Sequence, residues 1–255
     1  MSAIDPATVS ASAPAGPTLC LVLGDQLNPL HSWFDRPDPQ RIHVLLELRQ
    51  ETDYVVHHAQ KVIAIFAAMR DFARQLKDRG HRVRHVAIDD ASNRQSLTAN
   101  LDALVAHYGA SGVEWQPPDE WRLDAQLNDW ATRQTIPCRR VDSGHFYTAR
   151  GEAAELFVGR KQWLLEHFYR TLRRRHGVLL DADGQPEGGQ WNFDADNRKS
   201  WPGDPPEPVD RRPRHDHSKL WHQIQAAGIT TMGQPQAADF RWPLNRSEAL
   251  NQLDD

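Results

Sequence analysis

Short unbroken runs of apolar residues alternate along the first half of the chain with segments of helical periodicity. The runs predict buried strands at residues 19–23, 42–48, 83–88, 112–116 and 136–141. Apolar residues at helical spacing predict helices over residues 62–76, 95–108 and 123–133. The first of these helices is expected to be capped by Thr52 or Asp53 and to end at Gly80. This alternation predicts an α/β fold with a five-stranded parallel sheet and helices on both faces.

The pattern changes after residue 147. Residues 152–176 predict one long helix that follows Gly151 and is closed by Gly177. Residues 181–217 are rich in proline and glycine and are expected to form an extended interdomain connector, before short helices at 218–227 and 247–253. We therefore expect a disordered tail over residues 1–17, a sheet domain over 18–147, and a segment over 148–255 with the long helix, the connector and the beginning of a further helical domain.

Composition excludes several classes of protein. A net charge of −4 argues against a uniformly basic nucleic-acid binder. The two cysteines, Cys20 and Cys138, cannot form a disulfide framework or supply four ligands to a metal cluster. Apolar runs are too short for a membrane span and the chain has no signal peptide, so we expect a cytoplasmic protein with no membrane partner.

The first candidate for a binding site is the end of the first predicted strand, in the sequence TLCLVLGDQLN at residues 18–28. Gly24 permits a sharp turn, which leaves Asp25 and Gln26 at the carboxyl end of the strand. Open α/β sheets bind ligands at this edge. The alternative is that Asp25 only caps the turn that follows.

A second group of polar residues follows the second predicted strand, in the sequence ELRQETDYVVHHAQK at residues 47–61. It contains Glu47, Glu51, Tyr54, His57, His58 and Lys61. Such a group could hold the polar edge of a planar ligand against the Asp25–Gln26 turn, or it could be a solvated helix start whose histidines cover the sheet edge. A zinc site at His57 and His58 is not favoured, because adjacent histidines lack the i,i+3 or i,i+4 spacing of helical ligands.

Two further segments stand out in the second half. The sequence GGQWNFDADNRK at residues 188–199 has glycines for tight backbone geometry and two aromatic anchors, Trp191 and Phe193, which favours a rigid strap between domains over a binding loop. Arginines at positions 170, 173–175, 211, 212 and 214 are either a solvated surface or a weak contact for phosphates.

Taken together, the motifs resemble one family, the bacterial cryptochrome/photolyase class with an iron–sulfur cluster, also called deoxyribodipyrimidine photolyase-related proteins. The matching segments are LVLGDQLN at 21–28, LLELRQETDYVVHHAQKVIAIFAAMRDFA at 45–73, DEWRL at 119–123, GRKQWLLEHFYRTLRRRHGVLL at 159–180 and GGQWNFDADNRK at 188–199. They occur in the order and with the spacing of the family.

The resemblance implies a Rossmann-like N-terminal domain that binds an antenna chromophore, 6,7-dimethyl-8-ribityllumazine, at its strand ends. Carried over by motif, the contacts come from Gly24, Asp25, Gln26, Leu46, Glu47, Glu51, Tyr54, His57 and Ile65.

The resemblance also implies a C-terminal helical domain that binds FAD, an iron–sulfur cluster and damaged DNA. We expect neither FAD nor the cluster in this chain, because the sequence ends where that domain is expected to begin. It is then the antenna half of a protein of light-dependent DNA repair or blue-light sensing, without catalysis or strong DNA binding of its own. The alternative is a non-catalytic chromophore- or nucleotide-binding module that acts with a separate helical subunit or associates with itself.

Overall fold

The computed structural model describes residues 16–195, 198, 200 and 209–253, which form two compact units. The first unit combines residues 16–143 with residues 211–253, and the second contains the described residues between 144 and 210. Most of the predicted tail lies outside the described residues. Gly16 and Pro17, which we assigned to that tail, are instead held in place because Ser111 donates hydrogen bonds to both of their carbonyl groups.

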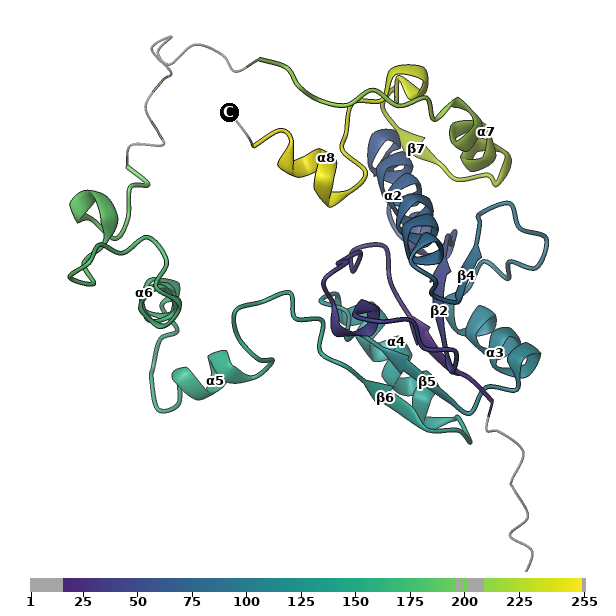
Figure 1. Cartoon of the computed structure of the whole chain (residues 1–255), viewed down its shortest axis with the longest axis horizontal. Helices are drawn as coiled ribbons and strands as arrows, with labels where there is room; N and C mark the ends of the chain where they lie inside the picture. Colours follow the sequence, from purple (N-terminus) through teal and green to yellow (C-terminus); the bar gives the residue numbers. More distant parts are fainter. Residues whose placement is uncertain (1–15, 196–197, 199, 201–208, 254–255) are drawn as a thin grey trace, which may run out of the picture. The chain divides into compact units, whose positions relative to one another are not determined.

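The first unit is built on a five-stranded parallel sheet with the order β4-β2-β1-β5-β6 (Figure 1). Its strands are β1 (Thr18–Leu21), β2 (Arg41–Leu46), β4 (Val83–Val86), β5 (Gly112–Trp115) and β6 (Cys138–Arg140). The predicted α/β sheet is therefore confirmed. Each strand ends before its apolar run does, so that Val22 and Leu23 already belong to the connection that leaves the edge of the sheet.

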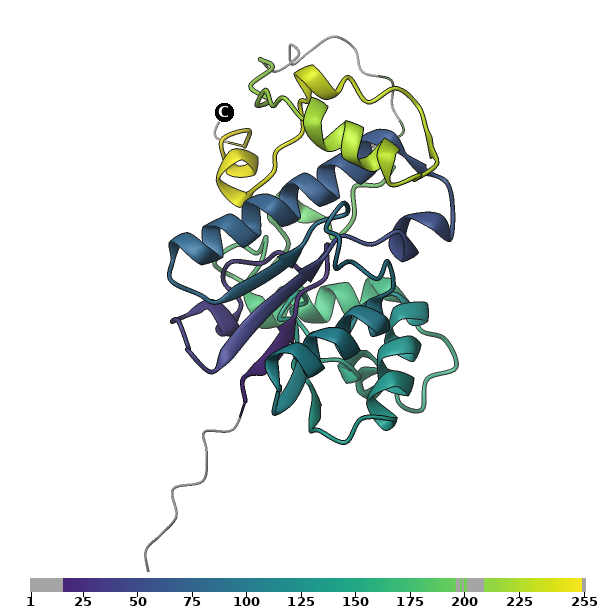
Figure 2. The same cartoon turned by 90° about the vertical axis from the view of Figure 1, so that its right-hand side faces the viewer.

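Helices cover both faces of this sheet (Figure 2). Helix α2 (Ala59–Asp78) packs on one face, and α3 (Leu97–Tyr108) and α4 (Trp121–Thr132) pack on the other. Successive side chains of β1 point to opposite faces of the sheet. Cys20 therefore packs in the apolar cluster under α2, while Leu19 and Leu21 pack in the cluster under α3 and α4.

The predicted start of the first long helix is wrong. Thr52 and Asp53 lie in a separate short helix, α1 (Gln50–Asp53), and a short strand, β3 (His57–His58), comes before α2. His58 is the N-cap of α2, because its Nδ1 accepts a hydrogen bond from the backbone N–H of Gln60 at 3.2 Å. The chain is extended here because β3 pairs with β7 (Thr231–Met232), a distant segment that helical periodicity cannot reveal.

The end of the described chain packs on the same unit as the sheet. It contains α7 (Ser218–Ala226), β7, the 3-10 helix η4 (Ala237–Asp239) and α8 (Arg246–Leu250). Leu220, Ile224 and Phe240 are buried in the cluster that also holds the apolar face of α2. The compact unit that contains the sheet therefore consists of the described residues up to 143 and resumes at residue 211. A further 3-10 helix, η1 (Ser32–Phe34), lies between β1 and β2.

The second unit contains two helices where we predicted one. Helix α5 (Glu152–Leu156) and helix α6 (Leu165–His176) are separated by a loop in which Gly159 has a φ of +74°. Because this left-handed conformation cannot continue a right-handed helix, the predicted single helix over 152–176 is wrong. Gly177 closes α6 in the left-handed conformation, as predicted.

The segment after α6 is anchored by Trp191 and contains the 3-10 helix η2 (Glu187–Gly189). The guanidinium groups of Arg170, Arg173 and Arg174 lie 5.5, 5.0 and 4.6 Å from the centre of the Trp191 ring. Arg173 is buried and donates hydrogen bonds to two backbone carbonyls of the following turn. These arginines therefore fix the turn and the strap, of which Asp196, Asn197 and Lys199 lie outside the described residues.

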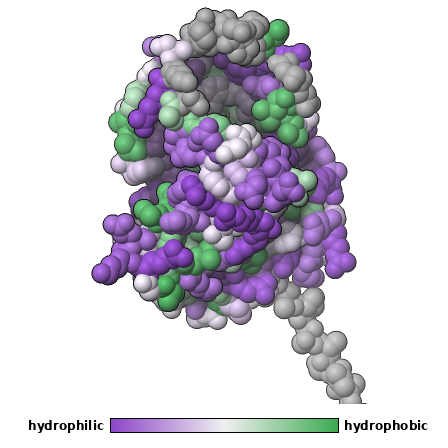
Figure 3. Space-filling model, turned by 90° about the vertical axis from the view of Figure 1, so that its left-hand side faces the viewer, coloured by the Kyte–Doolittle hydropathy of each residue, from purple (hydrophilic) through white to green (hydrophobic). Residues whose placement is uncertain are grey.

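Apolar side chains on the surface are distributed unevenly. On the face drawn in Figure 3, hydrophilic residues predominate and hydrophobic residues form separate patches. Trp163 and Trp242 are exposed, whereas Trp221 is half-buried against the core under α2. None of the helices in the described ranges is long and apolar enough to cross a membrane.

A buried histidine on β2 predicts how stability depends on pH. His43 is almost fully buried, and its ring lies 4.9 Å from that of Phe34 and 5.3 Å from that of His81. Burial, and then the proximity of His81, lower the pKa of His43 from 6.5 to about 4. The unfolded chain binds this proton below pH 6.5 and the folded chain does not, so stability falls as the pH drops from 6.5 towards 4.

We expect His43→Leu to remove up to about 3 kcal/mol of this pH dependence. Urea unfolding at a series of pH values measures it, with His222→Leu at an exposed position of α7 as the matched control. If the free energy of unfolding of His43→Leu falls between pH 6.5 and 4 as steeply as that of the wild type, other groups cause the loss of stability in acid.

Candidate functional site

A cavity of about 250 Å³ opens at the carboxyl edge of the sheet, where the chain leaves β1 and β2. Most of the residues proposed from the sequence line it, namely Gly24, Asp25, Leu46, Glu51, Tyr54, His57 and Ile65. The connection from β5 to α4 supplies a further wall. Because β1 is followed by β2 on one side and flanked by β5 on the other, the cavity lies at the point where the strand order reverses, which is where open parallel sheets bind ligands.

The floor of the cavity is apolar and comes largely from α2. Ile65, Phe66 and Met69 face the turn that follows β1. A Cβ atom at Gly24 would lie 2.8 Å from Cγ2 of Ile65 and 3.2 Å from Sδ of Met69. Glycine at position 24 therefore lets the helix approach the turn closely, and a larger residue would displace the floor.

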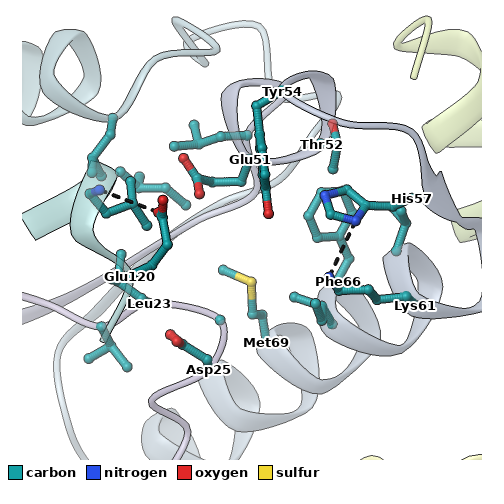
Figure 4. Close-up of a pocket in the computed structure, with 18 of the residues that line it drawn as sticks. Leu23, Asp25, Glu51, Thr52, Tyr54, His57, Lys61, Phe66, Met69 and Glu120 are labelled. Atoms are coloured by element: carbon teal, nitrogen blue, oxygen red, sulfur yellow. Dashed lines mark hydrogen bonds between the residues drawn. The ribbon is translucent and has the colours of Figure 1, made fainter. Parts of the chain in front are cut away.

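Carboxylates collect on one side of the cavity. Figure 4 shows Asp25, Glu51 and Glu120 on this side. The guanidinium of Arg122 binds both oxygens of Glu51, at 2.9 and 3.3 Å, and lies 3.2 Å from Glu120. The guanidinium carbon Cζ of Arg122 also lies 4.4 Å from the centre of the Tyr54 ring. Arg122 thus holds an acidic and an aromatic side chain in fixed positions while Asp25 adds a further negative charge.

The opposite side of the cavity is basic (Figure 4). Nδ1 of His57 lies 3.3 Å from Nζ of Lys61. Partial burial, and then the charge of Lys61, lower the pKa of His57 from its ordinary value. A neutral His57 can accept a hydrogen bond from Lys61, which leaves the ammonium as the positive charge on this side. The cavity therefore offers a slot between an acidic wall and a basic one, above an apolar floor.

Gln26 and Glu47 were proposed as contacts, but both are buried outside the cavity lining. Gln26 locks the turn after β1, because its Oε1 accepts from the N–H of Leu23 and its Nε2 donates to the carbonyl of Gln116, both at 3.1 Å. His58, from the same polar group, caps α2 and lies at its N-terminus. These hydrogen bonds give Gln26 a structural role in the turn, which is the alternative to the predicted contact with a ligand.

Glu47 has no exposed surface and binds groups from three elements. It accepts hydrogen bonds from Arg70 at 2.7 and 2.8 Å and from the N–H of Ile88 at 2.9 Å, and it lies 2.9 Å from Nε2 of His85. Burial alone would raise the pKa of Glu47, but the hydrogen bonds from Arg70 and His85 outweigh burial and hold the pKa below its usual value. Glu47 is therefore an ionised anchor between β2, β4 and α2.

Sequence reasoning missed the wall that follows β5. Glu120 caps α4 by accepting hydrogen bonds from the backbone N–H groups of Arg122 and Leu123, and all of these residues line the cavity. The sequence could have indicated this wall. Ligands bind at the carboxyl ends of parallel strands, and β5, which lies beside β1, has its carboxyl end at the same edge.

The structure is that of an α/β protein with a cavity at the topological switch point of a parallel sheet. A family described as deoxyribodipyrimidine photo-lyase-related protein matches residues 20–242, and the chain belongs to this family. It is also similar to a (6-4) photolyase of Agrobacterium fabrum (strain C58 / ATCC 33970), with 38% identity over 198 residues. That match covers 77% of this chain and 38% of the relative, so it spans well under half of the relative's length.

The geometry of Glu47 predicts a loss of stability when its charge is removed. Glu47→Gln leaves the guanidinium of Arg70 without its buried counter-ion, which we expect to lower the free energy of unfolding by about 3 kcal/mol. Glu51→Gln is the matched control, because the Glu51 carboxylate is partly exposed whereas that of Glu47 is fully buried, and the expected loss is below about 1 kcal/mol. Urea denaturation of both variants measures the difference. Equal losses would contradict the anchoring role of Glu47.

Proposed function

We propose that this chain is the antenna-binding part of a photolyase-related protein of light-dependent DNA repair or blue-light sensing. The observation that carries the proposal is the cavity at the switch point, with its apolar floor between an acidic and a basic wall. The chromophore we propose is 6,7-dimethyl-8-ribityllumazine, which would absorb light and pass the excitation energy on.

The cavity fits a small fused-ring heterocycle better than a dinucleotide. Its volume of about 250 Å³ lies just below the usual range for ligand pockets, roughly 300–1,000 Å³. Ile65, Met69 and Leu46 offer apolar surface to the ring, and the carboxylates of Asp25 and Glu51 can accept hydrogen bonds from ring N–H or ribityl hydroxyl groups. Lys61 can donate to a ring carbonyl from the other side.

The same side chains argue against a nucleotide as the ligand. The three carboxylates outnumber the cations of Arg122 and Lys61, and Arg122 is already engaged by two of them. A phosphate group would meet net repulsion in the cavity. The alternative of a chromophore-binding module that works with a separate helical subunit, or that self-associates, uses the same site and differs only in the partner.

We propose that FAD, the iron–sulfur cluster and damaged DNA are bound by longer proteins of the family and not by this chain alone. The two cysteines of this chain, Cys20 and Cys138, are too few to ligate such a cluster. Burial raises the pKa of Cys20 to about 12, which keeps it a neutral thiol and a poor ligand. We therefore propose that light-driven electron transfer and lesion binding do not occur in this chain alone, and that its attraction to DNA is weak.

Filling the cavity should abolish binding. Ile65→Trp places an indole in the apolar floor, and we expect the affinity for added 6,7-dimethyl-8-ribityllumazine to fall at least tenfold while the far-UV circular dichroism is unchanged. Fluorescence titration measures the dissociation constant. Ile65→Leu conserves the volume and is expected to bind within threefold of the wild type. A wild-type protein that does not bind the lumazine would refute the proposed function.

Removing the carboxylate of Asp25, which has no ion-pair partner among the residues that the structure describes, should weaken binding without affecting the fold. Asp25→Asn replaces a charge-assisted hydrogen bond by a neutral one, and the expected loss of affinity is about tenfold, or about 1.4 kcal/mol. Asp35→Asn removes the same charge from an exposed position beside η1 and serves as the control. Equal affinities of the two variants, measured in the same titration, would show that Asp25 does not contact the ligand.

A further inference from the structure

The basic wall of the cavity is held by a segment that comes much later in the chain. His57 lines the cavity, and in the parallel pair of β3 with β7 it lies opposite Thr231, while His58 lies opposite Met232. Residues 229–233 do not themselves line the cavity. They can therefore act on the cavity only through residues against which they lie, and His57 of β3 is such a residue.

Gly233 packs directly against His58. A Cβ atom at position 233 would lie 2.1 Å from Nε2 of His58 and 2.7 and 2.8 Å from two carbons of the same ring. The ring can swing away only by giving up the hydrogen bond with which its Nδ1 caps α2 through the N–H of Gln60. Any side chain at position 233 must therefore displace β3, break the cap, or push β7 away.

The late segment is itself firmly attached to the sheet unit. Ile224 and Ile229 are buried in the core under α2. Arg70 donates a hydrogen bond of 2.7 Å to Oε1 of Gln223, whose Nε2 donates to Asp89 at 2.6 Å. Because the attachment of α7 fixes where β7 begins, the segment provides a rigid support for β3 and not a mobile flap.

We propose that residues 229–233 are a positioning element for the ligand cavity, and that Gly233 is the residue that sets the place of His57 and Lys61 in its basic wall. The proposal rests on the proposed function of the cavity. It implies that ligand binding and the docking of β7 are coupled, so that a bound ligand stabilises the β3–β7 pair by the same factor by which the pair improves ligand affinity.

Two glycine variants separate this role from general backbone strain. Gly233 and Gly228 have φ values of +78° and +75°, so alanine is equally strained at both positions. At Gly228 the nearest atom to an added Cβ is Nη1 of Arg49, at 3.8 Å, which is an ordinary contact. We expect Gly233→Ala to weaken lumazine binding at least tenfold relative to Gly228→Ala, and to lose more thermal stability, because only position 233 adds a steric clash to the backbone strain.

A compensating substitution tests the steric contact. Serine is a good N-cap and lacks the imidazole ring, so His58→Ser can keep α2 capped while it makes room for alanine at position 233. The double variant His58→Ser/Gly233→Ala is expected to bind within threefold of His58→Ser. If Gly233→Ala fails to fold, rescue of folding by His58→Ser supports the same contact, and failure of that rescue overturns it.

Hydrogen exchange gives a readout that does not depend on ligand. In the ligand-free protein, the amides of residues 57–61 should exchange at least tenfold faster in Gly233→Ala than in Gly228→Ala. In the wild type, saturating lumazine should slow exchange at residues 229–233. Wild-type protein that binds no lumazine refutes the proposed function but leaves the ligand-free comparison to decide the positioning role. Equal binding and equal exchange in the two glycine variants would overturn the inference.

Discussion

The geometry of the sheet unit depends on the hydrogen bonds and the ion pair that the buried carboxylate of Glu47 makes. This carboxylate is fully buried, and it holds Arg70 of α2, His85 of β4 and the backbone beyond β4 at the end of β2. An ionised group in such a place is costly unless every partner is present, so the arrangement tolerates little displacement of any element. Arg70 lies on the same helix as Met69, one of the floor residues, so this ion pair also helps to hold the helix that forms the floor of the cavity. Through Gln223 the same guanidinium reaches α7 and links the late segment to the sheet.

The cavity combines contributions that are separated in the sequence but adjacent in the topology. Turns after β1 and β2 and the start of α4 meet there because parallel strands deliver their carboxyl ends to one edge. Arg122 has a distinctive part, since it binds two carboxylates that would otherwise repel each other and lies over the Tyr54 ring. The acidic side of the slot is thus built as a unit, while Lys61 and His57 on the other side depend on β3. The two walls have separate supports and respond to different substitutions.

The sheet and most of the cavity lining could be predicted because they follow from local patterns. Apolar runs and helical spacing are properties of consecutive residues, and the resemblance to the family supplied the strand ends that matter. Gln26 and Glu47 could not be distinguished from ligand contacts in this way, because a polar residue at a strand end looks the same whether it faces a cavity or a buried arginine. The start of α2 was misplaced for a related reason: His58 becomes a cap only because β7 holds β3 extended. Gly159 likewise ended a helix that its neighbours would have continued.

The pairing of β3 with β7 has a consequence for synthesis of the chain. His57 leaves the ribosome long before Thr231, and the residues of the second unit are made in between. At roughly 5–20 residues per second, the partner strand arrives about ten to thirty-five seconds later. During that interval the nascent sheet can form with α2 and α3 in place, but the edge of β3 remains unpaired and the basic wall of the cavity is not yet formed. Completion of the cavity is therefore a late event in biogenesis, set by the arrival of residues 229–233 and not by completion of the sheet.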